Sequence, residues 1–438
     1  MDLLKDNIKK LYFRFLIPSL GSAMVLSIYT MTDAIVIGKG VGADALAALS
    51  ITTPVLCLLM ATGILFGVGG SVHMNIQRGL HNEAKARRFF TVSLILISAV
   101  ALFLWIVYRL YTPEILHLMG ATEKLFPYAA SYMGWFNYFL PVAVFSNYLA
   151  IFVRNDNDPN RAMAGVIGGG ILNIVLDIVL VFPFKCGIGG AAIASCLGMC
   201  LQILIVSSHF LTKKNTLKLI RPHHFFQTAG LIISGGTSSF VNELANGVIV
   251  FLFNIQILKY CGTIALSVYS VISNCVILFN SLFTGVGQAI QPIVSTNFGA
   301  GQHERIQHLK RMSLTTIFSM GLLFSLSGIL FPYLVCGIFL PLTPQIKETA
   351  NYGIRLYFIA FLPMGWNIVN TYYMQSILAS KTSLVISITR NIILSGGLIL
   401  LLPVFCDGSV LWYTMPIVEL TVLCGYYLYT FVHRRTTH

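Results

Sequence analysis

Only 10% of the 438 residues are charged, whereas 56% are hydrophobic. Soluble globular domains carry about 25% charged residues, so this chain has too little polar material to cover a water-facing surface. A formal charge of +13 would suggest a nucleic-acid partner in a soluble protein, but here the basic residues lie in short loops between apolar runs. Composition therefore argues against nucleic-acid binding and indicates an integral membrane protein whose main partner is the lipid bilayer.

Twelve apolar runs are long enough to cross a membrane, which takes about 20 helical residues. Lipid offers no water to bond a free backbone, so runs of this length are expected to be α-helices. In chain order the predicted spans are 11–38, 44–71, 89–111, 125–153, 161–183, 188–212, 227–258, 264–290, 312–340, 348–378, 382–403 and 409–432.

The basic residues divide unequally between the two sides of the membrane. The side that would hold both termini carries 20 Lys and Arg residues, and the other side carries 6. Basic residues concentrate in cytoplasmic loops, so we expect a multi-pass protein of the plasma (inner) membrane with both termini in the cytoplasm. No small-residue cleavage site follows a short apolar core near the N-terminus, so the first span is expected to be retained.

The chain also repeats itself. At a shift of 220 residues, GADALAALS (42–50) meets GTIALSVYS (262–270), and Gly79 meets Gly299. Each half has six spans, an even number, so the two halves are parallel repeats related by an axis along the membrane normal. We predict an all-α protein of two parallel six-helix bundles around a central cavity, a transporter architecture, and we expect a monomer. The lobes would cover 1–212 and 227–438, joined by a cytoplasmic linker at 213–226.

Four carboxylates lie deep within the predicted spans: Asp33, Asp177, Glu243 and Glu419. A charge at the bilayer centre costs about 2.5–3.5 kcal/mol on insertion scales. Such acids usually face a water-filled cavity or an ion site. The alternative is a structural hydrogen bond between helices, with the acid kept neutral. For Glu419 the sequence offers no evident partner, and the structural role is favoured. Two arginines, Arg355 and Arg390, also fall within spans.

Asp177 lies within the stretch NIVLDIVLV, and other polar residues are expected near it. Asn173 precedes it by four residues and so shares its helical face. Ser195 follows in the next span, and Asp33 lies in the C-terminal part of the first. Carboxylate, amide and hydroxyl oxygens suit a hard cation such as Na⁺, and two adjacent carboxylates can hold a proton instead. We therefore expect a cation-coupling site, in which Asp33, Asn173 and Asp177 could ligate Na⁺.

Several of these stretches resemble one known family. YTMTDAIVIGKGVGADALAALS, MNIQRGLHNEAKARR and NIVLDIVLV followed after seven residues by GGAAIAS are similar to multidrug and toxic compound extrusion (MATE) transporters. The resemblance covers nearly the whole chain. It implies two six-helix bundles that export cationic and amphiphilic organic compounds, driven by Na⁺ or H⁺. It also implies a coupling site at Asp33, Asn173, Asp177 and Ser195, with a contribution from a carbonyl near Ala191.

The resemblance assigns further roles. Pro18 matches a proline linked to bending of the first helix, and a proline does remove a backbone donor. Glu243 matches an acid of the seventh span and is expected to attract a cationic substrate. The family's usual acid in the tenth span is missing here, since 348–378 has no acid beyond Glu348. Tyr29, Asn147 and Met199 are expected substrate contacts.

Other functions were weighed on the same residues. A flippase for lipid-linked saccharides, of the same superfamily, would have a cavity richer in arginine. A membrane-embedded transferase would need His, Asp or Glu clustered at one membrane face. The chain has no Walker-type glycine-rich loop and no evident nucleophile–base pair, so we expect a secondary antiporter and not an enzyme, with no cofactor beyond the coupling ion.

Overall fold

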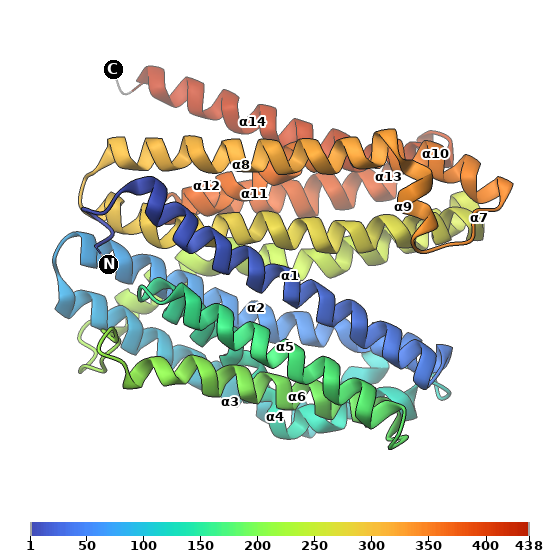
Figure 1. The fold of residues 1–438 in the computed structure, drawn as a ribbon, viewed down its shortest axis with the longest axis horizontal. Coiled ribbons are helices and arrows are strands. Elements are labelled where there is room, and N and C mark those ends of the chain that lie inside the picture. The colour runs from blue at the N-terminus through green and yellow to red at the C-terminus, as the bar shows by residue number, and fades with distance from the viewer. Residues whose placement is uncertain (1, 437–438) are drawn as a thin grey trace.

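The computed structural model describes residues 2–436, with side chains to residue 431, and all of its regular elements there are helical (Figure 1). The first half comprises α1 (Ile8–Gly40), α2 (Ala43–Gly79), α3 (Glu83–Leu118), α4 (Phe126–Asn155), α5 (Pro159–Val181) and α6 (Gly187–Ser207), followed by a 3₁₀ turn, Ser208–Leu211. The second half comprises α7 (Phe225–Gly299), α8 (His303–Leu330), α9 (Pro332–Gly337), α10 (Pro344–Phe358), α11 (Phe361–Ser376), α12 (Ser380–Ile388), α13 (Gly397–Phe405) and α14 (Thr414–Thr436). A π-helical segment, Thr389–Gly396, joins α12 to α13, and a 3₁₀ turn, Gly408–Tyr413, precedes α14.

These elements make twelve membrane crossings, as predicted. Within the described residues, ten continuous helical stretches are long and apolar enough to span. One of them is the 75-residue α7, which breaks at Gly262, where φ is +83°, and so crosses twice. The pair α10–α11 supplies the remaining crossing. The prediction of an all-α membrane protein with six helices in each half is confirmed, whereas the exact lobe boundaries stay predictions.

Each half builds its own hydrophobic core, but two helices change sides. Leu11, Tyr12 and Phe15 of α1 are buried in the core of the second half, whereas Val36 and Ile37 of the same helix belong to the core of the first half. Tyr12 also donates a hydrogen bond to Thr316 of α8 (2.8 Å). Figure 1 shows α1 running obliquely between the two groups of helices.

The beginning of α7 makes the reciprocal exchange. Ala229 and Ile232 are buried in the core of the first half, and Phe253 and Ile257 of the same helix in the core of the second. The first and seventh crossings are repeat equivalents, so the exchange follows the internal symmetry. On the side that holds both termini, which we call the termini side, each half is therefore completed by a helix from the other.

The two halves meet closely on the termini side through paired glycines. A Cβ atom on Gly79 of α2 would lie 2.1 Å from the carbonyl oxygen of Thr296, and one on Gly299 of α7 would lie 2.1 Å from that of Ile76. Such distances leave no room for any side chain, so the two backbones touch. Gly79 and Gly299 are also the pair that the sequence repeat aligns, which places this contact on the axis that relates the halves.

Apolar and polar contacts surround the glycine pair. A third, small cluster of buried residues joins Val68, Val72 and Ile76 of α2 to Ile151 of α4, with Phe298 of α7 packed against it from the second half. Close by, the buried Arg154 of α4 donates a hydrogen bond to Gln288 of α7 (2.6 Å). Together these contacts close the molecule between its halves on the termini side.

The linker between the halves is fixed to the first half by a buried acid. Asp156, in the turn between α4 and α5, accepts hydrogen bonds from Arg78 (2.7 Å) and from the backbone N–H of Thr216 in the linker (3.0 Å). The His209 ring lies between Asp156 (2.7 Å) and Asp158 (3.2 Å). Burial alone would raise the pKa of Asp156, but the hydrogen bond with His209, the charge of Arg78 and the bonds from Thr216 outweigh it and lower that pKa.

Leucine at Gly79 is expected to force the two halves apart on the termini side, because its Cβ alone would overlap the Thr296 carbonyl. A reporter cysteine at Val72, in a protein without native cysteines, should then react faster with an impermeant maleimide. Gly425→Leu is the matched control, because nothing lies within 4 Å of a Cβ at this helical glycine. Equal reaction rates in the Gly79→Leu protein and in the control would contradict the proposed closure.

Asp156→Asn should lower the free energy of unfolding at pH 7 by about 3–5 kcal/mol, since it leaves the largely buried Arg78 guanidinium without its anion. A carboxyl whose pKa is lowered by folding stabilises the fold above its unfolded pKa and loses that effect as pH falls. The difference from the wild type should therefore shrink below about pH 4. Thermal unfolding of both proteins between pH 3 and 8 measures it, and Asp44→Asn, at an exposed ion pair with Lys124, should change little. A difference that stays constant with pH would rule out the charge of Asp156 as its cause.

Candidate functional site

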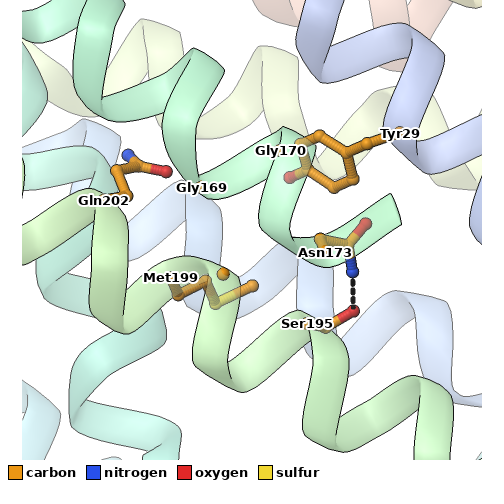
Figure 2. A pocket seen from close by; sticks show the side chains of 8 residues that line it. Tyr29, Gly169, Gly170, Asn173, Ser195, Met199 and Gln202 are labelled. Atoms are coloured by element: carbon orange, nitrogen blue, oxygen red, sulfur yellow. Dashed lines mark hydrogen bonds between the residues drawn. The ribbon is translucent and has the colours of Figure 1, made fainter. Parts of the chain in front are cut away.

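The predicted coupling residues come together between α1, α5 and α6 of the first half. Asn173 Nδ2 donates a hydrogen bond to Ser195 Oγ (3.1 Å), as Figure 2 shows. The carboxyl groups of Asp33 and Asp177 are close electrostatic neighbours. Exposed fractions are 8% for Asp33, 2% for Asn173, 0% for Asp177 and 9% for Ser195, so the group lies inside the bundle.

Small residues allow α5 and α6 to approach each other at this point. A Cβ atom on Gly169 would lie 2.6 Å from the carbonyl oxygen of Gly198, and one on Gly198 would lie 2.7 Å from that of Gly169. The two helix backbones are therefore in contact one turn from Asn173. This spacing brings a short serine hydroxyl on α6 within reach of an asparagine on α5.

The cluster has more acceptors than donors. Four buried oxygens have no hydrogen-bond donor: Asp33 Oδ1, Asn173 Oδ1 and both oxygens of Asp177. A buried acceptor without a partner costs about 1–3 kcal/mol, and more when it is charged. Two ionised carboxylates close together also repel each other. A bound cation or a shared proton would relieve both costs, and oxygen donors of this kind match Na⁺.

A conventional transition-metal centre does not fit the same residues. Within residues 2–436, no three His, Cys, Asp or Glu side chains gather closely enough to hold a metal ion. A cation at this site would therefore be held by two carboxylates, an amide oxygen and neutral oxygens. That donor set is hard and oxygen-only, which favours an alkali cation or a proton.

Tyr132 of α4 is a member of the cluster that the sequence did not single out. It is 2% exposed and lies near Ser195, Asp33 and Asp177. It is one of 19 tyrosines, and nothing in its local sequence marks it. Only the packing of α4 against α6 reveals its place.

A small pocket lies beside Asn173 and Ser195 (Figure 2). Tyr29, Met199 and Gln202 line it together with glycines of α5 and α6. Its volume of about 20 Å³ is far below the roughly 300–1,000 Å³ of ligand pockets, and one water molecule needs about 10–15 Å³. It therefore has room for water or an ion next to the cluster.

The other predicted contacts lie elsewhere. Asn147 of α4 packs beside Gly63 of α2. Glu243 of α7 lies in the second half, where Cys57 of α2 and Tyr372 of α11 are its electrostatic neighbours. Pro18 is buried in α1, just after the segment that enters the second half's core. The structure thus unites Asp33, Asn173, Asp177 and Ser195 with Tyr29 and Met199 nearby, and keeps Glu243 apart.

Comparisons with known proteins agree on one family. The MatE family profile matches residues 18–179 and 239–397, that is, most of both halves. The multidrug export protein MepA of Staphylococcus saprophyticus is 24% identical over 319 residues, which cover 72% of this chain and 69% of MepA. MepA of Staphylococcus aureus (strain MSSA476) is 22% identical over 415 residues, which cover 93% and 90%.

The fold agrees as well. A solved structure described as the outward-facing conformation of a multidrug resistance MATE family transporter of the MOP superfamily superimposes with a TM-score of 0.90. The match covers 98% of this chain and 97% of that one, at 21% identity. At this identity the likeness speaks for the fold alone.

Proposed function

The chain belongs to the MATE family of transporters, and on this basis we propose that it is a secondary active antiporter. It would export cationic or amphiphilic organic compounds in exchange for Na⁺ or H⁺. The observation that carries the proposal is the set of four buried acceptor oxygens without donors at Asp33, Asn173 and Asp177. Such a site has a use only when a cation or proton occupies it for part of the time.

Antiport requires the coupling ion to favour one conformation over another, because a ligand with equal affinity for both shifts nothing. α1 offers a connection between the site and the closed interface. Asp33 lies in its first-half portion, whereas Tyr12 and Phe15 lie in the core of the second half. Pro18 lies between them and lacks a backbone donor, so occupation of Asp33 can change how α1 bends there.

The relatives support the same substrate class. Those compared above are named multidrug export proteins, which favours organic substrates over the lipid-linked saccharide of a flippase. Glu243 supports a cationic preference, because it is a half-buried carboxylate in the second half, away from the coupling cluster. We further propose that the termini side is cytoplasmic, in line with its excess of Lys and Arg, and that the protein acts in the cell membrane.

Asp33→Asn and Asp177→Asn should each reduce gradient-driven export to background while leaving the protein folded. Asparagine keeps the size and one oxygen, but it neither attracts a cation nor takes up a proton. Dye efflux from vesicles with an imposed Na⁺ or pH gradient measures the effect. Asp44→Asn, at an exposed carboxylate of the same half, should transport as the wild type does. Wild-type export by the Asp177→Asn protein under every gradient would make the carboxylate a structural group.

Glu243→Gln should weaken export of cationic dyes about tenfold, corresponding to about 1.4 kcal/mol of lost attraction, while neutral compounds keep their rate. The reason is that the substitution removes one negative charge and keeps the shape. Competition assays with matched cationic and neutral substrates in the same vesicles measure the ratio. An equal loss for both classes would instead indicate a second coupling site at Glu243.

A further inference from the structure

The second half contains a buried ion pair deep in its bundle. Both Arg390 Nε (2.9 Å) and Arg390 Nη2 (2.6 Å) donate to Glu419 Oε1. Glu419 Oε2 accepts from Arg390 Nε (3.0 Å) and from Asn367 Nδ2 (2.8 Å). Glu419 is fully buried and Arg390 is 9% exposed. Every oxygen of this carboxylate therefore has a donor, and its charge is neutralised by a fixed partner.

The π-helical segment Thr389–Gly396 gives Arg390 this position. A π-helical turn holds more residues than an α-helical turn and is often found at functional sites. Arg390 bonds to Glu419 of α14, while the next residue, Asn391, donates to Asn242 of α7 (2.5 Å). Adjacent side chains thus reach two different helices on either side of the segment.

This ion pair lies between the second half's counterparts of the two crossings that hold the coupling site. At the shift of 220 residues, Arg390 and Glu419 meet Gly170 and Met199, which line the pocket beside that site. In the first half, the cluster joins the fifth crossing (α5) to the sixth (α6) through Asn173 and Ser195. In the second half, Arg390 and Glu419 join the fifth crossing (α12–α13) to the sixth (α14).

The two equivalent places differ in their charge balance. Among the described residues, the site in the first half has two carboxylates and four acceptor oxygens without donors. The site in the second half has one carboxylate whose oxygens accept from a guanidinium and an amide. We propose that Arg390 is a tethered cation that occupies, in the second half, the place that the coupling cation takes in the first. This inference rests on the proposed antiport function.

The consequence is an asymmetric transporter. A guanidinium stays protonated at any physiological pH and cannot leave, because it is part of the chain. Glu419 is therefore closed to Na⁺ and H⁺ throughout the cycle, and Arg390 restricts cation coupling at these equivalent places to the first half.

Cation binding to purified protein tests this without measuring transport. The parent protein carries Asp33→Asn and Asp177→Asn, which remove the first-half site. Its Glu419 and Arg390 are unchanged. At pH 8 its melting temperature should be the same in NaCl and in choline chloride of equal ionic strength. Addition of Arg390→Gln frees Glu419, and NaCl should then raise the melting temperature, on the order of 5 °C near saturation.

Two further variants serve as controls. Arg390→Lys keeps a tethered charge and should remain insensitive to Na⁺. Arg390→Gln with Glu419→Gln removes both charges, so it should fold and again show no Na⁺ effect. If the Arg390→Gln protein folds in NaCl but not in choline chloride, the proposal is also supported, because folding then depends on Na⁺.

Three outcomes would overturn the proposal. The Arg390→Gln protein folds and shows no Na⁺ effect. It fails to fold in both salts while the double substitution folds, which shows that Glu419 cannot recruit a free cation. Or the parent protein already responds to Na⁺ and loses the response with Glu419→Gln. Because no transport is measured, a failure of the proposed antiport in vesicles is a separate result.

Discussion

The free-energy cost of burying a carboxylate away from water determines which partners the buried acids of this protein need. An ionised group in a low-dielectric interior needs a partner of opposite charge or a proton. Glu419 has such a partner in Arg390, and Asp156 has Arg78 with His209 beside it. Among the described residues, Asp33 and Asp177 are each other's electrostatic neighbours and have no ion pair. This lack of a fixed cationic partner is the reason why we propose that a cation or a proton binds there.

The connection between that pair and the rest of the protein is mechanical. α1 carries Asp33 in one core and buries Leu11 and Tyr12 in the other. A close-packed interior transmits small displacements instead of absorbing them. A change in the separation of the two carboxylates can therefore displace the part of α1 that enters the second half, next to the interface between the two halves.

Much of this arrangement could be predicted from the sequence, because the membrane reduces folding to the length and polarity of helices. The twelve crossings, the internal repeat and the shared helical face of Asn173 and Asp177 follow from apolar runs and helical spacing, whereas the meeting of these two with Asp33 and Ser195 was predicted from the resemblance to the MATE family. Pairings between distant helices do not. Arg390 and Glu419 are visible as intramembrane charges, but the π-helical segment that turns one toward the other has no evident sequence signal.

The packing of α1 and α7 was equally hidden. The sequence places Tyr12, Phe15 and Ile232 within apolar runs, but it does not show against which half they pack, since both cores are made of the same residue types. Tyr132 likewise gained its place from the contact of α4 with α6. The cluster at Asp156 and His209 depends on a turn and a linker, whose geometry composition alone does not determine.

The exchange of α1 and the start of α7 between the cores also affects how the protein is made. A ribosome delivers α1 first, but the second-half residues that share a core with Leu11 and Phe15, such as Phe253 and Ile293, emerge more than two hundred residues later. Until then the beginning of α1 has only lipid or an insertion factor to rest against. The first half therefore cannot mature alone, and assembly of the two bundles is completed late in synthesis, when the second half closes around a helix that was inserted at the start.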